Sequence, residues 1–183
     1  KLSLQAALQA EKETFSRFIE RLRVSRNPQE RKFYANRLDF TVASIRQVQD
    51  EVLDEHTAVV EYLLGFGRIR SLIVTRDTAV AMSDAVDSTI YTLIGRYKNS
   101  LSGEKQTYKK TAEHLYQVVF EMMDRLFSER KIKNVIIIPD KQLSGVLFEA
   151  LLNPSNSEAG EFQQLPYLLS RYSIGYHYSM TSL

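Results

Sequence analysis

The run Val-Ile-Ile-Ile at residues 135–138 constrains the fold more than any other feature of the sequence. A near-continuous stretch of β-branched residues is typical of a strand buried on both faces of a parallel or mixed sheet. Pro139 and Asp140 follow the run and end it. We therefore expect residues 134–138 to form a central strand of a sheet.

Strand and helix patterns alternate along the chain on both sides of this run. β-Branched and aromatic residues cluster around two glycines, Gly65 and Gly67, which is typical of a β-hairpin. Apolar residues at helical spacing follow. The expected strands are Thr57–Leu64, Arg68–Thr75, Thr78–Met82 and Tyr172–Tyr178, and the expected helices are Ile90–Tyr97 and Tyr108–Phe127, with a polar loop at 98–107. This order predicts the α/β class, a mixed sheet flanked by helices.

A helical hairpin is expected over residues 3–50, ahead of the α/β part. Between its helices, Asn27 is expected to be the N-cap, Pro28 to occupy the first turn and Glu30 to complete a capping box. The apolar faces of the two helices are Leu4, Leu8, Phe15, Phe18, Ile19 and Leu22, then Tyr34, Leu38, Val42, Ile45, Val48 and Val52. We therefore predict a helical hairpin or linker at 1–52 and an α/β domain at 53–183.

The composition argues against several classes of function. Lys and Arg number 24 against 22 Asp and Glu, a net charge of +2, so no nucleic-acid partner is expected. No apolar run approaches the roughly 20 residues that span a bilayer, and we expect a cytoplasmic protein without a membrane partner. Cysteine is absent, which removes disulfides, thiolate metal sites and a cysteine nucleophile from this chain. No cofactor or metal site is expected, and the absence of an initiator Met suggests a fragment.

The acidic pair Asp140 and Glu149 is the first candidate for chemistry. Asp140 follows the carboxyl end of a buried strand, where α/β folds often place ligand groups. General acid–base catalysis needs a suitable partner, and only Ser144 and Glu149 are local. We favour structural roles instead. Asp140 would cap the turn, Phe148 and Leu151 would fill the core, and Glu149 would accept hydrogen bonds from the backbone or an arginine. A small hydrolase that uses both acids stays an alternative.

Three other positions are weaker candidates. His177 and Ser179 supply two residue types of a hydrolase triad, but they lie two residues apart on one face of an expected strand, without a G-x-S-x-G motif. His114 lies beside a helical stripe without other metal-ligand types, so we expect it at the surface or partly packed. Met122 and Met123 are expected to fill the core.

Two segments carry recognisable motifs, VIIIPDKQLSGVLFEALL at 135–152 and YLLSRYSIGYHYSMTSL at 167–183. They resemble the CHAT domain, a caspase-like domain commonly found after tetratricopeptide repeats in bacteria, whose signatures read approximately IPDG-x-L-x-x-L-P-F-E-A-L and Y-L-x-x-x-Y-x-I-x-Y-x-x-S-x-x-L. An upstream hairpin and a long helix extend the resemblance over about residues 50–183. The matching positions are Pro139, Asp140, Phe148, Glu149, Ala150, Leu151, Tyr172, Tyr176 and Ser179.

Two positions depart from these signatures. Lys141 stands where the family usually has glycine, and Leu147 where it usually has proline, so the turn after the strand is expected to differ. The resemblance implies a cysteine peptidase whose catalytic His-Gly and later Ser-Ala-Cys-like motifs both follow the last strand motif. His177 lies inside that motif and is not followed by glycine, and the chain has no cysteine.

The resemblance therefore implies the amino-terminal, non-catalytic part of a CHAT-type peptidase domain, with no catalytic residue in this chain. A pseudo-enzyme platform for protein partners is the alternative. The expected partners are proteins: the remaining half of the domain, upstream repeats and a peptide substrate. Because no Lys, Asp or Glu lies between Tyr172 and Leu183, we also expect self-association through this strand edge or through the N-terminal helices.

Overall fold

The computed structural model describes residues 17, 20–21, 24–30, 43–156, 162–180 and 183. The chain forms two compact units, residues 1–42 and 43–183. Within the described residues, no helix is both long enough and apolar enough to cross a membrane.

The first unit is described around its expected helix start. Asn27 Oδ1 accepts a hydrogen bond from the backbone N–H of Gln29 at 3.0 Å, and a helical turn begins at Pro28, as predicted. The predicted capping box is wrong. The Glu30 carboxylate accepts from the Ser25 hydroxyl at 2.7 Å, and the Asn27 N–H donates to the same hydroxyl at 3.1 Å. Most of the predicted helical hairpin lies outside the described residues.

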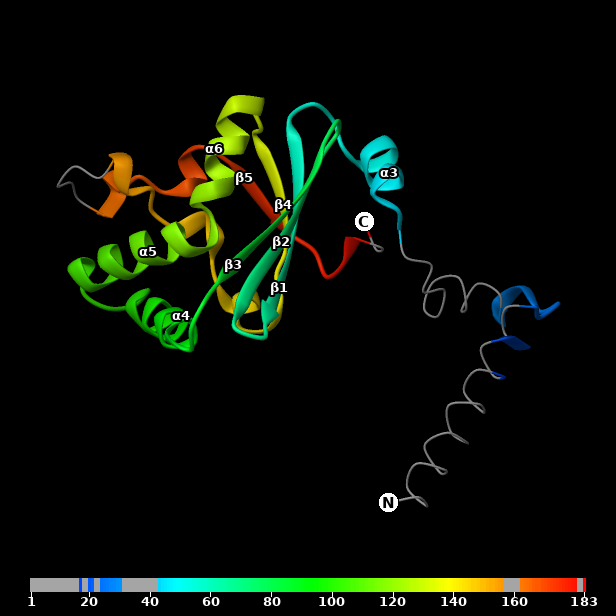
Figure 1. Ribbon diagram of the computed structural model, residues 1–183, viewed down its shortest axis with the longest axis horizontal. Coiled ribbons are helices and arrows are strands. Elements are labelled where there is room, and N and C mark those ends of the chain that lie inside the picture. Colours follow the sequence, from blue (N-terminus) through cyan, green and yellow to red (C-terminus); the bar gives the residue numbers. More distant parts are fainter. Residues whose placement is uncertain (1–16, 18–19, 22–23, 31–42, 157–161, 181–182) are drawn as a thin grey trace, which may run out of the picture. The chain divides into compact units, whose positions relative to one another are not determined.

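The second unit is built on a five-stranded mixed sheet in the order β3-β2-β1-β4-β5 (Figure 1). Strands β1 (Thr57–Gly65), β2 (Arg68–Thr75) and β3 (Ala79–Ala85) form an antiparallel meander. Strands β4 (Asn134–Ile138) and β5 (Ser173–Tyr176) are parallel to β1. The predicted α/β class is confirmed. β4 is paired on both sides, although β1 is the middle strand.

The hairpin between β1 and β2 turns through two residues with positive φ, Phe66 at 54° and Gly67 at 66°. This backbone is that of a two-residue hairpin turn whose twist matches the strands it joins. Gly65 pairs with Arg68 immediately before and after it. The two glycines of the sequence thus mark a hairpin turn, and the predicted strand bounds are confirmed to within one residue.

The bounds of β3 and β5 differ from the prediction, which gave Thr78–Met82 and Tyr172–Tyr178. β3 continues to Ala85 because β2 offers pairing partners as far as Arg68. β5 starts only at Ser173, because the Tyr172 N–H donates to the carbonyl of Leu168 rather than to β4. The backbone ladder between β4 and β5 ends with the bond from His177 N–H to the carbonyl of Ile137.

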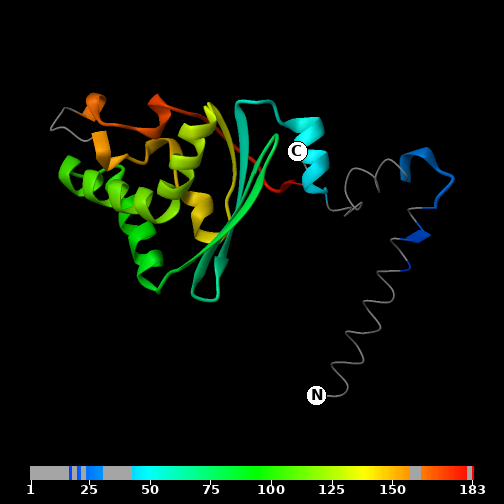
Figure 2. The same ribbon diagram turned by 45° about the horizontal axis from the view of Figure 1, so that its top comes forward.

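Three helices cover one face of the sheet, α4 (Thr89–Ser100), α5 (Lys105–Val119) and α6 (Glu121–Arg130) (Figures 1 and 2). The predicted continuous helix over 108–127 is wrong. Phe120 breaks it with φ −135° and ψ −24°, a change of direction that buries its ring. The polar loop is also shorter than expected, since α4 continues to Ser100.

The opposite face of the sheet carries a smaller apolar cluster. A helical segment packs there, formed by α3 (Ile45–Gln47) and the π-helical turn Val48–Val52. Ser44 caps α3 through a capping box with Gln47. The sequence assigned these residues to the N-terminal hairpin, whereas they lie in the second unit. The buried members of the cluster are Val48, Leu53, Val59, Val74, Ile138 and Met180.

Candidate functional site

The parallel strands β1, β4 and β5 end at the same edge of the sheet, and this edge is the candidate functional site. The pairs Glu61 with Ile138 and Ile137 with Tyr176 bring the strand ends together. Ligands of α/β folds commonly bind outside such carboxyl ends. Five of the motif residues predicted from the sequence lie here, Pro139, Asp140, Phe148, Glu149 and Tyr176.

Asp140 and Lys141 both bind the backbone of Leu64, near the end of β1. The ladder between β1 and β4 ends at Glu61, so Leu64 lies beyond it. Asp140 Oδ2 accepts from the Leu64 N–H at 2.8 Å, and Lys141 Nζ donates to the Leu64 carbonyl at 2.8 Å. The two side chains therefore continue the ladder. The prediction that Asp140 caps the following turn is wrong, because its side chain makes no capping bond there.

Lys141 adopts a left-handed backbone conformation, with φ at 50°. Glycine takes this conformation without a steric penalty, which is a physical reason for glycine in the motif that the sequence resembles. The lysine accepts the strained backbone and uses its ammonium group on Leu64. The turn after β4 thus keeps a backbone that glycine would also suit.

Glu149 binds a tyrosine on β5. The Tyr176 hydroxyl donates to Glu149 Oε2 and accepts from the backbone N–H of Phe148 at 2.8 Å. Burial raises the pKa of Tyr176, and the hydrogen bond to the Glu149 carboxylate raises it further. The predicted backbone or arginine donor to Glu149 is replaced by this hydroxyl. Asp140 and Glu149, the two acids of the hydrolase alternative, are each bonded to a different structural partner.

Phe148 and Leu151 fill the core behind this edge, as predicted, and both side chains are fully buried. The Phe148 ring lies 5.5 Å from the Tyr62 ring and 6.4 Å from the Tyr176 ring, between centroids. The carbonyl of Ala150, between them, accepts a hydrogen bond from the Tyr108 hydroxyl of α5. The motif thus locks strands β1 and β5 and helix α5 together.

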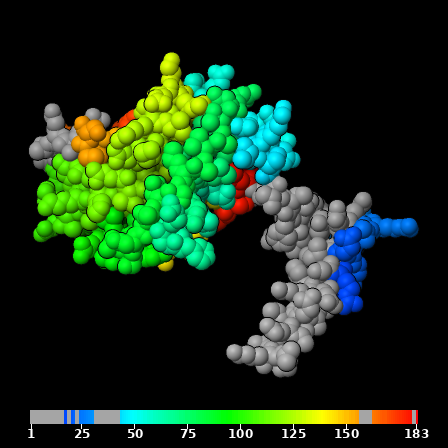
Figure 3. Space-filling model, viewed as in Figure 1, coloured from blue at the N-terminus to red at the C-terminus, as the bar shows by residue number. Residues whose placement is uncertain are grey.

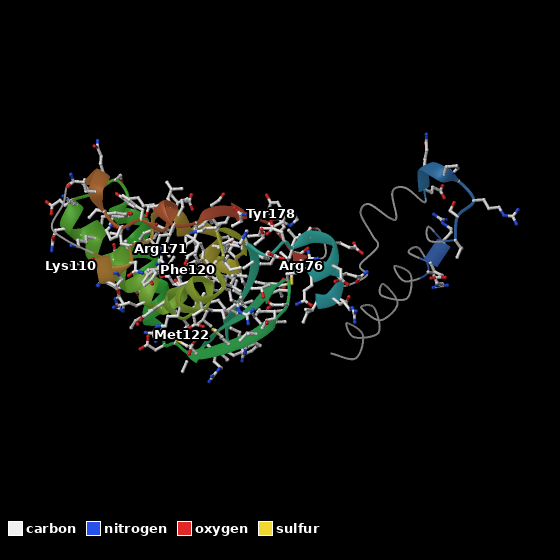
Figure 4. The ribbon with its side chains drawn as sticks, turned by 90° about the horizontal axis from the view of Figure 1, so that it is seen from above. Arg76, Lys110, Phe120, Met122, Arg171 and Tyr178 are labelled. Carbon is white, nitrogen blue, oxygen red and sulfur yellow. The ribbon has the colours of Figure 1, made fainter. Side chains whose placement is uncertain are left out.

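A buried carboxylate that the sequence analysis missed lies on α6. Asp124 is 4% exposed. Its carboxylate accepts from the hydroxyls of Tyr116 and Tyr172, the amide of Asn153 and the guanidinium of Arg171, with the Arg171 bond at 2.6 Å. These partners belong to α5, the chain just before β5 and the loop after residue 150, so one carboxylate joins three segments. Figure 4 labels Arg171, the cation of this network.

The network raises the pKa of its tyrosines. Burial and the hydrogen bond to Asp124 raise the pKa of Tyr172 to about 12. The sequence does carry a signal for the site, since Asp124 interrupts the apolar stripe between Phe120 and Phe127. A charged residue on a buried helix face is one that must be paired.

His177 and Ser179 do not meet as a base and a nucleophile. The Nδ1 atom of His177 lies 3.1 Å from the backbone carbonyl of Ser179. β5 ends at Tyr176, so the prediction that both residues lie on one strand face is wrong. The ring nitrogen faces a carbonyl, which can only accept a hydrogen bond, rather than the Ser179 hydroxyl.

The remaining candidates are divided between surface and core. His114 is exposed, within the expectation from the sequence. Met123 is buried, whereas Met122 is 55% exposed, so the prediction that both fill the core is half wrong. Among the described residues, no cluster of three or more His, Asp or Glu side chains could hold a metal ion.

This geometry defines a class of protein. It is an α/β unit in which two successive strands, β4 and β5, pair in parallel at one side of a mixed sheet. Residues 109–183 match the family model of the CHAT domain. This stretch runs from α5 to the end of the chain and includes β4 and β5, so the resemblance seen in the sequence is confirmed over it. The predicted extension upstream to residue 50 stays a prediction. No curated protein matches the chain.

Proposed function

We propose that residues 53–183 are the amino-terminal scaffold portion of a CHAT-type, caspase-like cysteine peptidase domain. The observation that carries the proposal is the CHAT match over 109–183. It includes two of the three parallel strands, β4 and β5, and the motif residues Asp140, Phe148 and Glu149, which make contacts between elements. Their role in the proposal is to hold the strand ends in place.

The proposal gives this chain no catalytic residue of its own. A cysteine peptidase needs a thiolate nucleophile and a histidine base within reach of it. The 183 residues contain no cysteine. The resemblance leaves His177 outside the His-Gly motif, because Tyr178 follows it.

The edge of β5 is the place where this proposal adds further sheet. Alternate residues of β5 donate to β4, namely Ser173 and, just past the strand, His177. The backbone groups of Ile174 and Tyr176 consequently point away from β4. We propose that the remaining half of the domain pairs with them, and that without it a second copy of the chain can do so. A cytoplasmic location and upstream tetratricopeptide repeats in a bacterial protein are proposed on the resemblance alone.

The experiment is a pair of activity assays on the 183-residue chain. Fluorogenic peptides with basic and acidic P1 residues should show no turnover, and a covalent cysteine-protease probe should leave the chain unlabelled. Turnover that disappears in Asp140→Asn or Glu149→Gln, at unchanged stability, would contradict the proposal and support the acid-based hydrolase.

A pseudo-enzyme platform for protein partners is the second candidate. The absence of cysteine and the structural use of the motif acids favour it. The coding sequence beyond Leu183 separates the two candidates. A His-Gly pair and a cysteine there support the peptidase, and a continuation without them supports the platform.

A further inference from the structure

The outer edge of β3 offers backbone groups to a further strand. The bonds Thr75 with Thr78 and Gly67 with Val86 fix the alternation of the β2–β3 ladder. Even-numbered residues of β3 therefore bond to β2, and odd-numbered residues direct their N–H and C=O groups away from it. The outward residues are Ala79, Ala81, Ser83 and Ala85, all exposed.

This edge has little of the protection that natural edge strands carry. β3 contains no lysine, arginine or proline, and its outward side chains are small. Among the described residues β3 pairs with β2 alone. One cation does reach the edge: Arg68 donates to the hydroxyl and the carbonyl of Ser83, at 2.7 and 2.8 Å. Three of the four outward residues stay uncovered by it, and such an edge is a template for strand addition.

A groove of about 390 Å³ runs beside the same strand, on the helix-covered face of the sheet. Met82 and Asp84 of β3 line one side of it, and Leu93, Val118 and Met122 of the helices line the other. Figure 4 shows Met122 at the side of the molecule where β3 runs, and Figure 3 shows β3 at the surface. A strand added to β3 would have one row of side chains at the mouth of this groove.

The charge of the groove selects among incoming strands. Asp84 and Asp87 line it, and no lysine or arginine does. Asp87 is engaged with the start of α4, where it accepts from the N–H of Thr89 at 2.8 Å. Asp84 lies on β3 itself and is exposed. Its carboxylate faces the groove as the charged group available to an incoming side chain.

We propose that β3 binds an extended segment of a partner protein as a sixth, antiparallel strand, with the pattern basic-x-apolar-x-apolar. The basic residue lies opposite Asp84, and the apolar residues lie opposite Met82 and Val80. Since these three residues bond to β2, they form non-hydrogen-bonded pairs with the new strand, the pair type with the closest side chains. The incoming N–H groups bond to the outward carbonyls and replace Arg68 at Ser83.

A different chain fits this edge better than a second copy. β3 carries no cation, so in any antiparallel pairing of β3 with itself Asp84 lies opposite an uncharged residue or another Asp84. Directly opposed like charges destabilise a strand pair, whereas opposite charges stabilise it. The inference does not depend on the peptidase assignment, because the backbone groups and the Asp84 carboxylate that it uses lie on β3, upstream of the CHAT match. Val118 and Met122, inside the match, enter only as lining of the groove.

The test is fluorescence polarisation with the labelled peptide Thr-Arg-Thr-Ile-Thr-Val-Thr and the whole chain. Saturable binding is expected. Ala81→Pro removes an outward N–H while sparing the bonds to β2, and should weaken binding at least tenfold. Asp84→Lys should weaken it by about tenfold, and a peptide with Glu in place of Arg should restore binding to that variant. Glu129→Lys, an exposed position on α6 with the same change of charge, is the control and should bind as the original chain does.

Several results would overturn the proposed strand addition at β3. Binding that is unchanged in Ala81→Pro, with circular dichroism as for the original chain, excludes strand addition at β3. A charge-swapped peptide that fails to recover binding to Asp84→Lys excludes the pairing with Asp84. An unbound peptide at millimolar concentration, or a β3-paired dimer that the peptide does not dissociate, excludes the partner segment as the occupant.

Discussion

The two edges of the sheet differ in how they are built and in what covers them. The β3 edge belongs to an antiparallel meander and has four residues with outward backbone groups, of which Arg68 covers one. The β5 edge belongs to the parallel part and has two, Ile174 and Tyr176. The CHAT match includes β5 and excludes β3. One edge thus lies inside the family pattern, where further sheet is proposed, and the other is open to a separate partner.

The parts next to these edges are also held together differently. Behind β5, aromatic rings and the buried Asp124 join helices, loops and strands that are far apart in the sequence. β3, in contrast, is held by its pairing with β2 and borders a partly open groove. We therefore expect substitutions behind β5 to cost the most unfolding free energy.

The largest expected effect is that of Phe148→Ala. Its ring is fully buried against Tyr62 and Tyr176, and loss of a buried Phe costs roughly 3–5 kcal/mol of unfolding free energy. Leu147→Ala, next to it at 45% exposure, is the control and should cost far less. A urea titration in which the two variants have the same midpoint would show that the motif does not anchor the core.

Asp124→Ala should cost about 3 kcal/mol, because it leaves several buried donors without their acceptor. The control is Asp77→Ala, which breaks a 2.6 Å ion pair with Arg130 but at a carboxylate that is 73% exposed. Exposed pairs contribute about 0–1 kcal/mol. Equal losses in the two variants, measured by denaturant unfolding, would mean that the network behind β5 contributes no more than a surface ion pair.

Asp140→Ala and Lys141→Gly test the two side-chain hydrogen bonds that hold the backbone of Leu64, which we call the clamp on Leu64. Loss of the aspartate should cost about 1–2 kcal/mol, since the Leu64 N–H keeps no other bond to β4. Lys141→Gly loses one hydrogen bond but relieves the left-handed backbone, so the two effects offset each other within about 1 kcal/mol. Thermal or urea melts decide the order, and a larger loss in Lys141→Gly would refute the clamp as described.

A further expected effect, absent at neutral pH, is a loss of stability at alkaline pH. Tyr172 keeps its proton to about pH 12 in the folded chain and to about pH 10 when unfolded. Between these values the folded state binds more protons, so its stability falls as the pH rises, while the contribution is complete below about pH 10. Urea unfolding at pH 8–12 should show the fall, and Tyr172→Phe should make it shallower. If the unfolding free energy of Tyr172→Phe fell as steeply with pH as that of the original chain, the raised pKa of Tyr172 would be contradicted.

Much of the antiparallel part could be predicted from the sequence because its signals are local. Glycines at 65 and 67 and the alternation around them give the hairpin and its register. The buried strand 134–138 was recognisable from its β-branched run. The longer β3 was missed because Asp84 and Ala85 have low strand propensity, and their partners on β2 decide the matter.

The parts that were missed depend on contacts between distant residues. No glycine or proline marks the helix break at Phe120, whose ring is buried against Tyr116, Phe127 and Tyr172. The clamp on Leu64 joins residues about 76 positions apart. The sequence also could not identify the hydrogen-bond donor to Glu149. Only the parallel pairing of β4 with β5 brings the Tyr176 hydroxyl to that carboxylate.

Hydrogen exchange of the β5 amides, followed by NMR in a dilute, monomeric sample, tests most directly whether this edge is where the domain continues. The account predicts alternation: the amides of Ser173 and His177, bonded to β4, exchange slowly, and those of Ile174 and Tyr176 exchange fast. Slow exchange at Ile174 and Tyr176 equal to that of their neighbours would mean that the chain itself covers the edge, and would contradict the proposal that the sheet is completed by the rest of a CHAT domain.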